Sequence, residues 1–179
     1  MLSNDDVLIL PYSEDDLDNY IQTEMEEYSF ADTNPNDLKQ TGREVFAKAA
    51  NTEYFSIFLC PGKIYCGKIE LQHRESLPAP GIGIQILKRF RNQGIGTTAI
   101  KKFCYEIHES RGIDNLCVMI ERTNTASIHL FEKLGARYEG MKVALALDEV
   151  LRKAGITIDP ALLDMAKVRY YTLSLLSFV

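Results

Sequence analysis

The sequence predicts a mixed α/β fold in a single domain, residues 1–179. Short apolar runs rich in Val, Ile, Tyr and Phe alternate along the chain with segments whose apolar residues recur every three or four positions. The first pattern is typical of strands and the second of amphipathic helices. No linker, internal repeat or low-complexity tract divides the chain, and its length fits one domain. We therefore expect one core built from a sheet and helices.

Seven apolar runs predict strands, which cover residues 7–12, 54–60, 64–72, 82–87, 116–120, 137–143 and 168–178. The turn Pro61-Gly62-Lys63 joins the second and third of these into a β-hairpin. The tail LSLLSFV, residues 173–179, is too short to span a membrane and suits a final buried strand.

Helical spacing predicts three helices before residue 136, over 13–30, 96–111 and 124–135. Ser13 and Asp16 form a Ser-x-x-Asp capping pattern at the start of the first helix. Gly112 supplies the stop for the second. The third is capped by Asn124 or Thr125.

Two more helices, over 144–155 and 159–167, form a helical insertion at about 144–167 between the last two strands. Asp159 is expected at the N-cap of the second, followed by Pro160 at its first helical position. The first is amphipathic, and we expect it to cover a sheet edge or to form a homodimer contact rather than to close over a substrate.

The charge is distributed unevenly, although the net charge is only −5. The first 38 residues hold eleven acidic residues and no Lys or Arg, whereas the rest of the chain has an excess of six positive charges. An acidic end beside a basic remainder argues against a nucleic-acid binder. We favour a solvated acidic helix face over a functional field as the explanation. No signal peptide or membrane span is predicted.

Four cysteines, Cys60, Cys66, Cys104 and Cys117, form no C-x-x-C pair and have no His at ligand spacing. This pattern favours reduced, buried thiols in a cytoplasmic protein, without a metal site.

The stretch LKRFRNQGIGTTAIKKF, residues 87–103, places Gly94 and Gly96 where a helix begins. The first turn of a helix leaves backbone N–H groups unpaired, which favours a bound anion. Glycines there would let a diphosphate approach those N–H groups, and the surrounding Lys and Arg side chains would add positive potential. From the two glycines alone, a turn that merely needs positive φ explains the pattern equally well.

The run RNQGIGT, residues 91–97, resembles the Q/R-x-x-G-x-G/A signature of the GNAT (Gcn5-related N-acetyltransferase) superfamily. The later run RTNTASIHLFEKLGARYEG, residues 122–140, resembles that family's second conserved block, and the similarity covers about residues 82–140. The resemblance implies a predominantly antiparallel sheet of six to seven strands, flanked by helices and splayed between strands four and five. It also implies an acyltransferase that binds acetyl-CoA in the splayed cleft.

Carried over by position, the resemblance implies cofactor contacts from Ile84, Gln85, Ile86, Arg91, Asn92, Gln93, Gly94, Ile95, Gly96, Thr97, Asn124, Phe131 and Lys133. Residues 84–86 would pair with the pantetheine arm through their backbone, and residues 91–97 would hold the pyrophosphate. Phe131 and Lys133 would line the thioester and adenine-nucleotide ends. Taken alone, Asn124 is better explained as a helix N-cap, a role compatible with a cofactor contact.

The chemistry that the family performs needs a neutral amine, a stabilised oxyanion and a departing thiolate. The Ile86 backbone N–H is the oxyanion donor by analogy with the family. A carboxylate would remove the amine proton. Some members place a catalytic Glu at the start of the fourth strand, but here that stretch is Ala79-Pro80-Gly81.

Glu70 is the nearest substitute for that carboxylate. If the third and fourth strands pair antiparallel about a loop centred near Leu77, Glu70 lies opposite Ile84, beside the expected reaction centre. A Glu in mid-strand is more often a solvated outward residue. His73 is a weaker candidate for the base.

Phe131 stands where many members have a Tyr that protonates the leaving thiolate. A thiolate can depart without a general acid near neutral pH. The missing Tyr hydroxyl therefore changes how the thiolate is expected to leave, but it does not argue against acetyl transfer.

The acceptor is expected to be a cationic small-molecule amine. In the family that the chain resembles, the first helices help to frame the acceptor pocket, and here they are acidic, which favours a cation. A polyamine, an aminoglycoside or a lysine-like amine would fit. Two alternatives remain, a protein N-terminal or lysine acetyltransferase and a catalytically weak acyl-CoA-binding or sensory module.

Overall fold

The computed structural model describes residues 2–27, 40, 42–44, 51–143, 151, 154–155 and 158–178. Its strands are β1 (Val7–Pro11), β2 (Thr52–Leu59), β3 (Ile64–Gln72), β4 (Gly81–Ile86), β5 (Asn115–Ile120), β6 (Arg137–Val143) and β7 (Lys167–Ser174). The α-helices with described bounds are α1 (Leu17–Glu27), α3 (Ile95–Arg111), α4 (Thr125–Lys133) and α6 (Pro160–Met165). Short 3₁₀ helices are η1 (Asn4–Asp6), η2 (Glu14–Asp16), η3 (Lys88–Phe90) and η4 (Leu175–Phe178).

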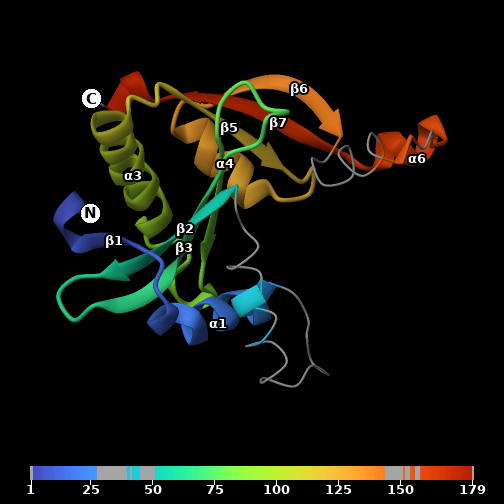
Figure 1. Ribbon diagram of the computed structural model, residues 1–179. Helices are drawn as coiled ribbons and strands as arrows, with labels where there is room; N and C mark the ends of the chain where they lie inside the picture. Colours follow the sequence, from blue (N-terminus) through green and yellow to red (C-terminus); the bar gives the residue numbers. More distant parts are fainter. Residues whose placement is uncertain are drawn as a thin grey trace.

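The strands form one seven-stranded mixed sheet in the order β1-β2-β3-β4-β5-β7-β6, which confirms the predicted fold class. Every neighbouring pair is antiparallel except β4 and β5, which run parallel. In Figure 1, α1 lies below the sheet, α3 stands at one side, and α6 projects from the end that carries β6 and β7.

The parallel strands β4 and β5 form a backbone pairing only near the start of β4. The register pairs Gly81 with Cys117, and the Cys117 amide donates to the Pro80 carbonyl at 2.8 Å. No further pairing joins these two described strands, so they separate toward Ile86 and Ile120. The splay between strands four and five is therefore confirmed.

The two faces of the sheet are covered by different helices. On one face α3 packs its apolar stripe against the core, where the Phe103 ring meets the Phe55 ring edge-on at 4.8 Å between centroids. On the other face α1 lies against β3, and its Thr23 hydroxyl is 2.8 Å from the Tyr65 hydroxyl. One face of the sheet, and of β4 within it, is therefore directed toward α3, and the other is directed toward α1; we call them the α3 face and the α1 face.

Capping explains where the helices begin. The Ser13 amide and hydroxyl both donate to Asp16 Oδ2 at 3.1 Å, as the capping pattern predicts. The chain first forms η2 and then α1, so the predicted helix over 13–30 is present through Glu27. Asp159 caps α6 by accepting from the Ala161 amide at 2.7 Å, which confirms that prediction.

The predicted helix over 144–155, with its expected edge-covering or homodimer role, falls largely outside the described residues, which begin again at residue 151.

The prediction that the final strand continues to residue 178 is wrong. β7 ends at Ser174, and η4 follows it. The Leu175 amide still donates to the Asp114 carbonyl at 2.8 Å, but β5 begins only at Asn115, so no strand remains for later residues to pair with. The chain turns instead and packs η4 against α3.

The prediction of buried free thiols is confirmed for three cysteines and wrong for the fourth. All four thiols are free, but Cys60 is only partly buried, whereas Cys66, Cys104 and Cys117 are buried. Burial raises the pKa of the Cys104 thiol to about 12, which keeps it protonated at neutral pH. Within the described ranges, no helix is long and apolar enough to cross a bilayer.

The close approach of β3 and β4 at Gly67 gives a stability test. A Cβ atom at this position would overlap the carbonyl oxygen of Gln85. We expect Gly67→Ala to lower the free energy of unfolding by about 1–3 kcal/mol, measured by urea denaturation, because paired strands must shift to make room. Gly83→Ala on the neighbouring strand is the control, since its Cβ would lie 3.8 Å from the nearest atom. Equal stability of the two variants would contradict this explanation.

Candidate functional site

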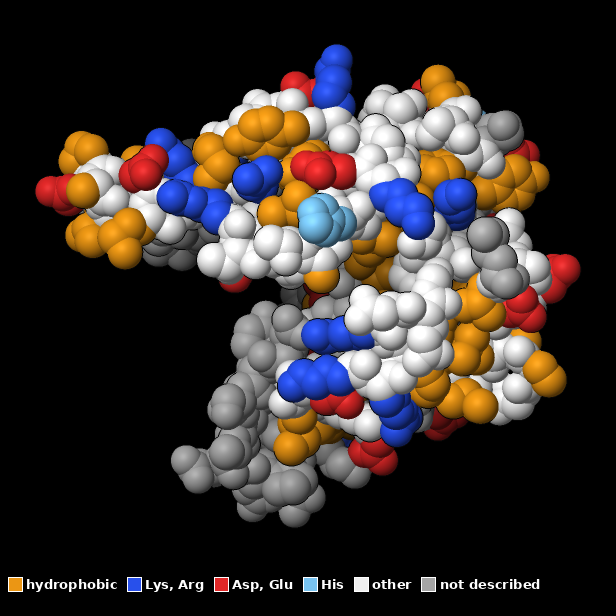
Figure 2. Space-filling view, turned by 180° about the vertical axis from the view of Figure 1, so that it is seen from behind, with side chains coloured by type: hydrophobic (Ala, Val, Ile, Leu, Met, Phe, Trp, Pro, Cys, Tyr) orange, Lys and Arg blue, Asp and Glu red, His pale blue; other side chains and the backbone are white. Residues whose placement is uncertain are grey.

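Two cavities flank the point where β4 and β5 separate. The α3 cleft, of about 570 Å³, lies between β4, the N-terminus of α3 and α4. The α1 cavity, of about 460 Å³, lies between β4, β5 and α1. Both are lined by Ile84, Gln85, Glu121, Asn124 and Ser127, so they adjoin. Figure 2 shows the surface deeply notched between the part that carries β6, β7 and α6 and the part that carries α1.

The N-terminus of α3 opens onto the α3 cleft. Gly94 is the N-cap, with φ of 83°, and no atom lies within 4 Å of where its Cβ would be. The turn thus requires the left-handed backbone that glycine adopts readily, which agrees with the interpretation of Gly94 as a residue needed for positive φ. Gly96 differs, because a Cβ there would touch Ile86, Leu130 and Ile84 at 3.6–3.9 Å along the cleft. The N–H groups of this first helical turn have no intrahelical acceptor, as in any α-helix.

The basic residues around this turn do not all face the cleft. Arg91 lines the cleft, and its Nε donates to the Ile86 carbonyl at 2.8 Å. Lys133 lines it from α4. Lys102 points elsewhere and donates to the Val7 carbonyl at 2.8 Å, which ties α3 to β1. The positive potential in the α3 cleft therefore comes from Arg91 and Lys133 rather than from all the Lys and Arg side chains around the turn.

Most residues predicted to contact the cofactor lie together in the α3 cleft. They are Ile84, Gln85, Ile86, Arg91, Asn92, Gly94, Ile95, Gly96, Thr97, Asn124 and Lys133. Gln93 is not among the lining residues, and its Nε2 donates to the Arg89 carbonyl at 2.8 Å. Phe131 and Glu70 line the α1 cavity instead. Phe131 is only 2% exposed and belongs to the main core.

One face of α4 lines the α3 cleft beyond the positions predicted from the sequence. Ala126, Ser127, His129 and Leu130 line the α3 cleft together with Lys133. The sequence could have indicated this face, because residues three or four positions apart in a helix share a face. Ala126, His129 and Leu130 stand at such spacings from Lys133 or from one another, and Lys133 was already predicted to contact the cofactor.

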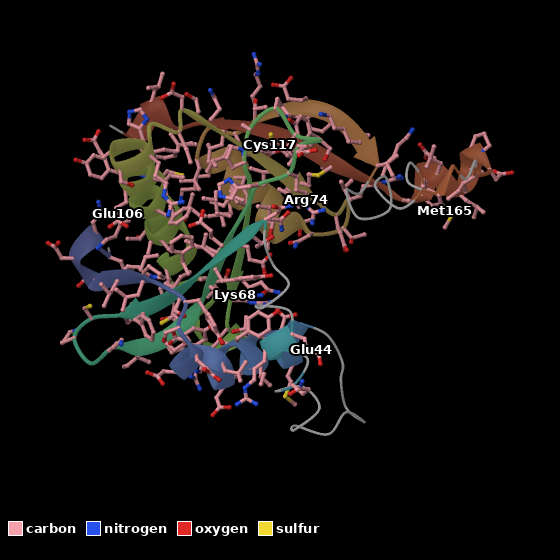
Figure 3. All side chains as sticks on the ribbon, in the orientation of Figure 1. Glu44, Lys68, Arg74, Glu106, Cys117 and Met165 are labelled. Carbon is pink, nitrogen blue, oxygen red and sulfur yellow. The ribbon has the colours of Figure 1, made fainter. Side chains whose placement is uncertain are left out.

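Lys68 is the buried cation of the α1 cavity. Its Nζ donates to Glu24 Oε1 and to Glu70 Oε1, each at 2.7 Å. The same Nζ lies 4.2 Å from the centre of the Tyr20 ring and 5.5 Å from that of Tyr54. Lys68 is 4% exposed, and Figure 3 shows it between the sheet and α1. An ammonium in this position is stable because two carboxylates and two aromatic faces replace its water.

The two tyrosines beside Lys68 are neutral phenols. Burial, with the charge of Glu24, raises the pKa of Tyr20 well above its ordinary value. Burial, with the charge of Glu70, raises the pKa of Tyr54 to about 12. Both rings therefore keep their protons at neutral pH, and their faces attract the Lys68 ammonium.

The predicted register of Glu70 is wrong by one residue. Glu70 pairs with Gly83, and Ile84 pairs with Ile69. The loop between β3 and β4 spans residues 73–80, an even number, so the ladder is not centred on Leu77. A shift of one residue moves a side chain to the opposite face of the sheet. Glu70 consequently lies on the α1 face, away from the Ile84 side chain.

Glu70 is nevertheless not a solvated outward residue. Its side chain is 24% exposed and lines the α1 cavity. Lys68 occupies Oε1, while Oε2 lies toward Gly83 and accepts from Gln72 Nε2 at 3.3 Å. His73, the weaker candidate, has its Nε2 2.7 Å from Glu53 Oε1. Arg111 donates to the same oxygen and holds the pKa of Glu53 below its usual range.

Gln85 presents an unmatched acceptor at the junction of the two cavities. Within the described part of the chain, its Oε1 is buried and accepts no hydrogen bond. A buried acceptor without a donor is costly, so such an atom indicates a place where a ligand donor is accommodated.

At least five of the eleven acidic residues near the N-terminus have hydrogen-bond or ion-pair partners in the described part of the chain. Asp6 and Asp16 accept from Ser3 and Ser13. Glu14 pairs with Arg43 at 3.3 Å, and Glu24 pairs with Lys68. Glu26 accepts from the Lys88 amide at 2.6 Å. The pair of Glu24 with Lys68 offsets negative charge at the wall of the α1 cavity. Across the residues that the structure describes, no group of three or more His, Cys, Asp or Glu side chains is placed to hold a metal ion.

Comparisons with known proteins agree with this geometry. Residues 6–137 match the family model described as an acetyltransferase (GNAT) domain. The spermidine/spermine N-acetyltransferase SpeG from Vibrio cholerae, solved with manganese ions, has a TM-score of 0.67 at 15% identity, over 98% of this chain and 96% of that one. The ribosomal L7/L12 alpha-N-protein acetyltransferase RimL, in complex with coenzyme A, has a TM-score of 0.68 at 14% identity, over 94% and 93%. No curated protein matches the chain in sequence.

Asn124 holds the start of α4, since its side chain accepts from the Ser127 amide at 3.1 Å. We expect Asn124→Ala to lower the free energy of unfolding by about 1 kcal/mol in the absence of ligand, measured by urea denaturation. Asn124→Ser is the control, because Ser is also a good N-cap and should retain most of that stability. If Asn124→Ala is as stable as Asn124→Ser, the cap contributes nothing.

Proposed function

Because the chain belongs to the acetyltransferase (GNAT) family of N-acetyltransferases, we propose that it transfers the acetyl group of acetyl-CoA to a primary amine of a cationic small molecule. One observation carries the proposal. The separation of β4 from β5 opens two adjoining cavities, one at the N-terminus of a helix and one lined by the buried Lys68 and its two carboxylate partners. Such a pair of cavities suits two substrates that react at their junction.

The residues of the α3 cleft fit acetyl-CoA. The first turn of α3, with Arg91 and Lys133, suits the pyrophosphate and the nucleotide end. β4 loses its neighbour after Gly81, so its edge can pair with the amides of an extended arm, and Gln85 Oε1 can accept from a donor there. Acetyl-CoA supplies an acyl group activated as a thioester.

The proposed reacting groups come from both sides of the junction, with Ile86 lining the α3 cleft and Glu70 and Phe131 lining the α1 cavity. The Ile86 backbone N–H is the proposed donor to the acyl oxygen. Glu70 is the proposed base, and its Oε2 takes the amine proton because Lys68 occupies Oε1. Phe131 offers no proton, so the thiolate departs unaided. Buried free thiols fit a reducing compartment, and we propose a cytoplasmic location.

A second candidate function is a catalytically weak acyl-CoA-binding module. The observation that favours it is the ion pair of Glu70 with Lys68, since the ammonium already occupies one oxygen of the proposed base. An assay of thiol release over a panel of amines separates the two functions. Acetyl-CoA binding without release on any amine would favour the binding module.

Acetyl-CoA should stabilise the protein thermally, because a ligand at 100 times its Kd adds about 2.7 kcal/mol to the folded state. Gly96→Val should lose most of this shift, since the added methyl groups project into the α3 cleft. Thr98→Val is the control on the same helix, at a position that does not line the cleft. The readout is the melting temperature with and without acetyl-CoA. A parent protein without any shift would contradict the cofactor assignment.

Glu70→Gln should lower kcat/KM by roughly 10²-fold at pH 7, because the amide cannot take the amine proton while it can still accept from Lys68. The loss should shrink at high pH, where more of the acceptor amine is already neutral. Glu75→Gln, in the loop between β3 and β4, is the control. Unchanged rates for Glu70→Gln across this pH range would exclude Glu70 as the base.

A further inference from the structure

Four side chains form a cage around the Lys68 ammonium. Glu24 and Glu70 each accept from Nζ at 2.7 Å, and the Tyr20 and Tyr54 rings lie 4.2 Å and 5.5 Å from it. Carboxylates combined with aromatic faces are the groups with which proteins bind alkylammonium ions. We call these four residues the ammonium cage.

The ammonium cage belongs to the wall of the α1 cavity. Tyr20, Glu24 and Glu70 line this cavity together with Lys68 itself. The Lys68 stem rises from the middle of β3, and its side chain is 5% exposed. The chain's own ammonium therefore fills the place in this cavity that is best suited to the ammonium of a ligand.

Little negative charge remains for a second cation. Among the described residues that line the α1 cavity, the carboxylates are Glu24, Glu70 and Glu121. Lys68 already pairs with the first two, and Glu121 is exposed, where a charge interaction is weak. A second ammonium on an acceptor would thus meet the positive charge of Lys68 without a buried carboxylate of its own.

We propose that Lys68 is a specificity-determining residue that occupies the ammonium cage and restricts the acceptor to amines with a single ammonium group. Diamines and longer polyamines are disfavoured, because their second charge finds the cage filled. The proposal rests on the proposed function in that the α1 cavity holds the acceptor, and it narrows the cationic acceptor class to monoamines.

The cage itself can be tested without turnover. Lys68→Ala removes three methylenes and the ammonium, the shape of n-propylammonium. We expect saturating n-propylammonium to raise the melting temperature of Lys68→Ala by about 5 °C or more, and that of the parent by much less. The uncharged n-propanol should give no such shift. Equal shifts in parent and variant, or equal shifts with n-propanol, would contradict the proposal that the ammonium cage binds a ligand ammonium when Lys68 is removed.

Two further variants keep the binding test decisive. Lys142→Ala is the matched control, because it removes an ammonium that lies 3.6 Å from the Tyr170 ring, outside the α1 cavity. It should show no rescue by n-propylammonium. If Lys68→Ala does not fold, Lys68→Met keeps a stem that reaches the position of Cε, and the ammonium ion becomes the probe. Absence of rescue in a folded Lys68→Met would overturn the proposal equally.

The acceptor preference is tested by turnover on n-butylamine and 1,4-diaminobutane. We expect the parent to favour the monoamine in kcat/KM, and Lys68→Ala to move the ratio toward the diamine by at least about 10-fold, a change of about 1.4 kcal/mol. A parent that prefers the diamine would overturn the role of Lys68 and leave the proposed function standing. Rescue by n-propylammonium with no turnover on any amine would overturn the proposed function, and the acceptor restriction with it.

Discussion

The site depends on the short hydrogen-bonded ladder between β4 and β5, because the two cavities open where this ladder ends. Parallel strands in the middle of a sheet normally share a full ladder, but here one pairing, Gly81 with Cys117, is followed by separation. Beyond that point the edge of β4 has backbone groups that the sheet does not satisfy, and buried backbone groups need partners. An extended ligand with amide groups can supply them. The α3 cleft and the α1 cavity both exist because the ladder stops there.

The two faces of β4 differ in character, one apolar and one polar, because side chains alternate between the faces along a strand. Ile84 and Ile86 point toward α3, where a Cβ at Gly96 would touch both. Gly83 and Gln85 belong to the opposite face, opposite Glu70 and Lys68 in the register. An apolar face beside a helix N-terminus suits a thioester arm with its phosphates. A polar face under α1 suits an amine.

Lys68 joins this polar face to α1. Burial of an ammonium is costly unless it is paired, and removal of one partner of a buried ion pair typically costs about 3–5 kcal/mol. Glu70 on the same strand supplies one partner, and Glu24 on α1 supplies the other. The charge of Lys68 therefore helps to hold α1 over the sheet while it lines the α1 cavity, the proposed acceptor site. The same contact can serve both stability and selection of the acceptor.

The sequence by itself determined the order of the seven strands and of the described α-helices, the caps at Ser13 and Asp159, and the family, because apolar periodicity, capping and the glycine motif are local patterns. It left the cap of α4 open between Asn124 and Thr125, and the structure gives that place to Asn124. The sequence also placed most of the residues that share the α3 cleft. Only the tertiary structure decided the register of Glu70, because the number of residues in the loop between β3 and β4 shifts the ladder by one. The pairing of Lys68 with Glu24 likewise joins positions 44 residues apart, and no local pattern specifies which of eleven acids near the N-terminus meets that ammonium. The end of β7 was decided by where β5 begins, since a strand continues only while a neighbour offers backbone partners.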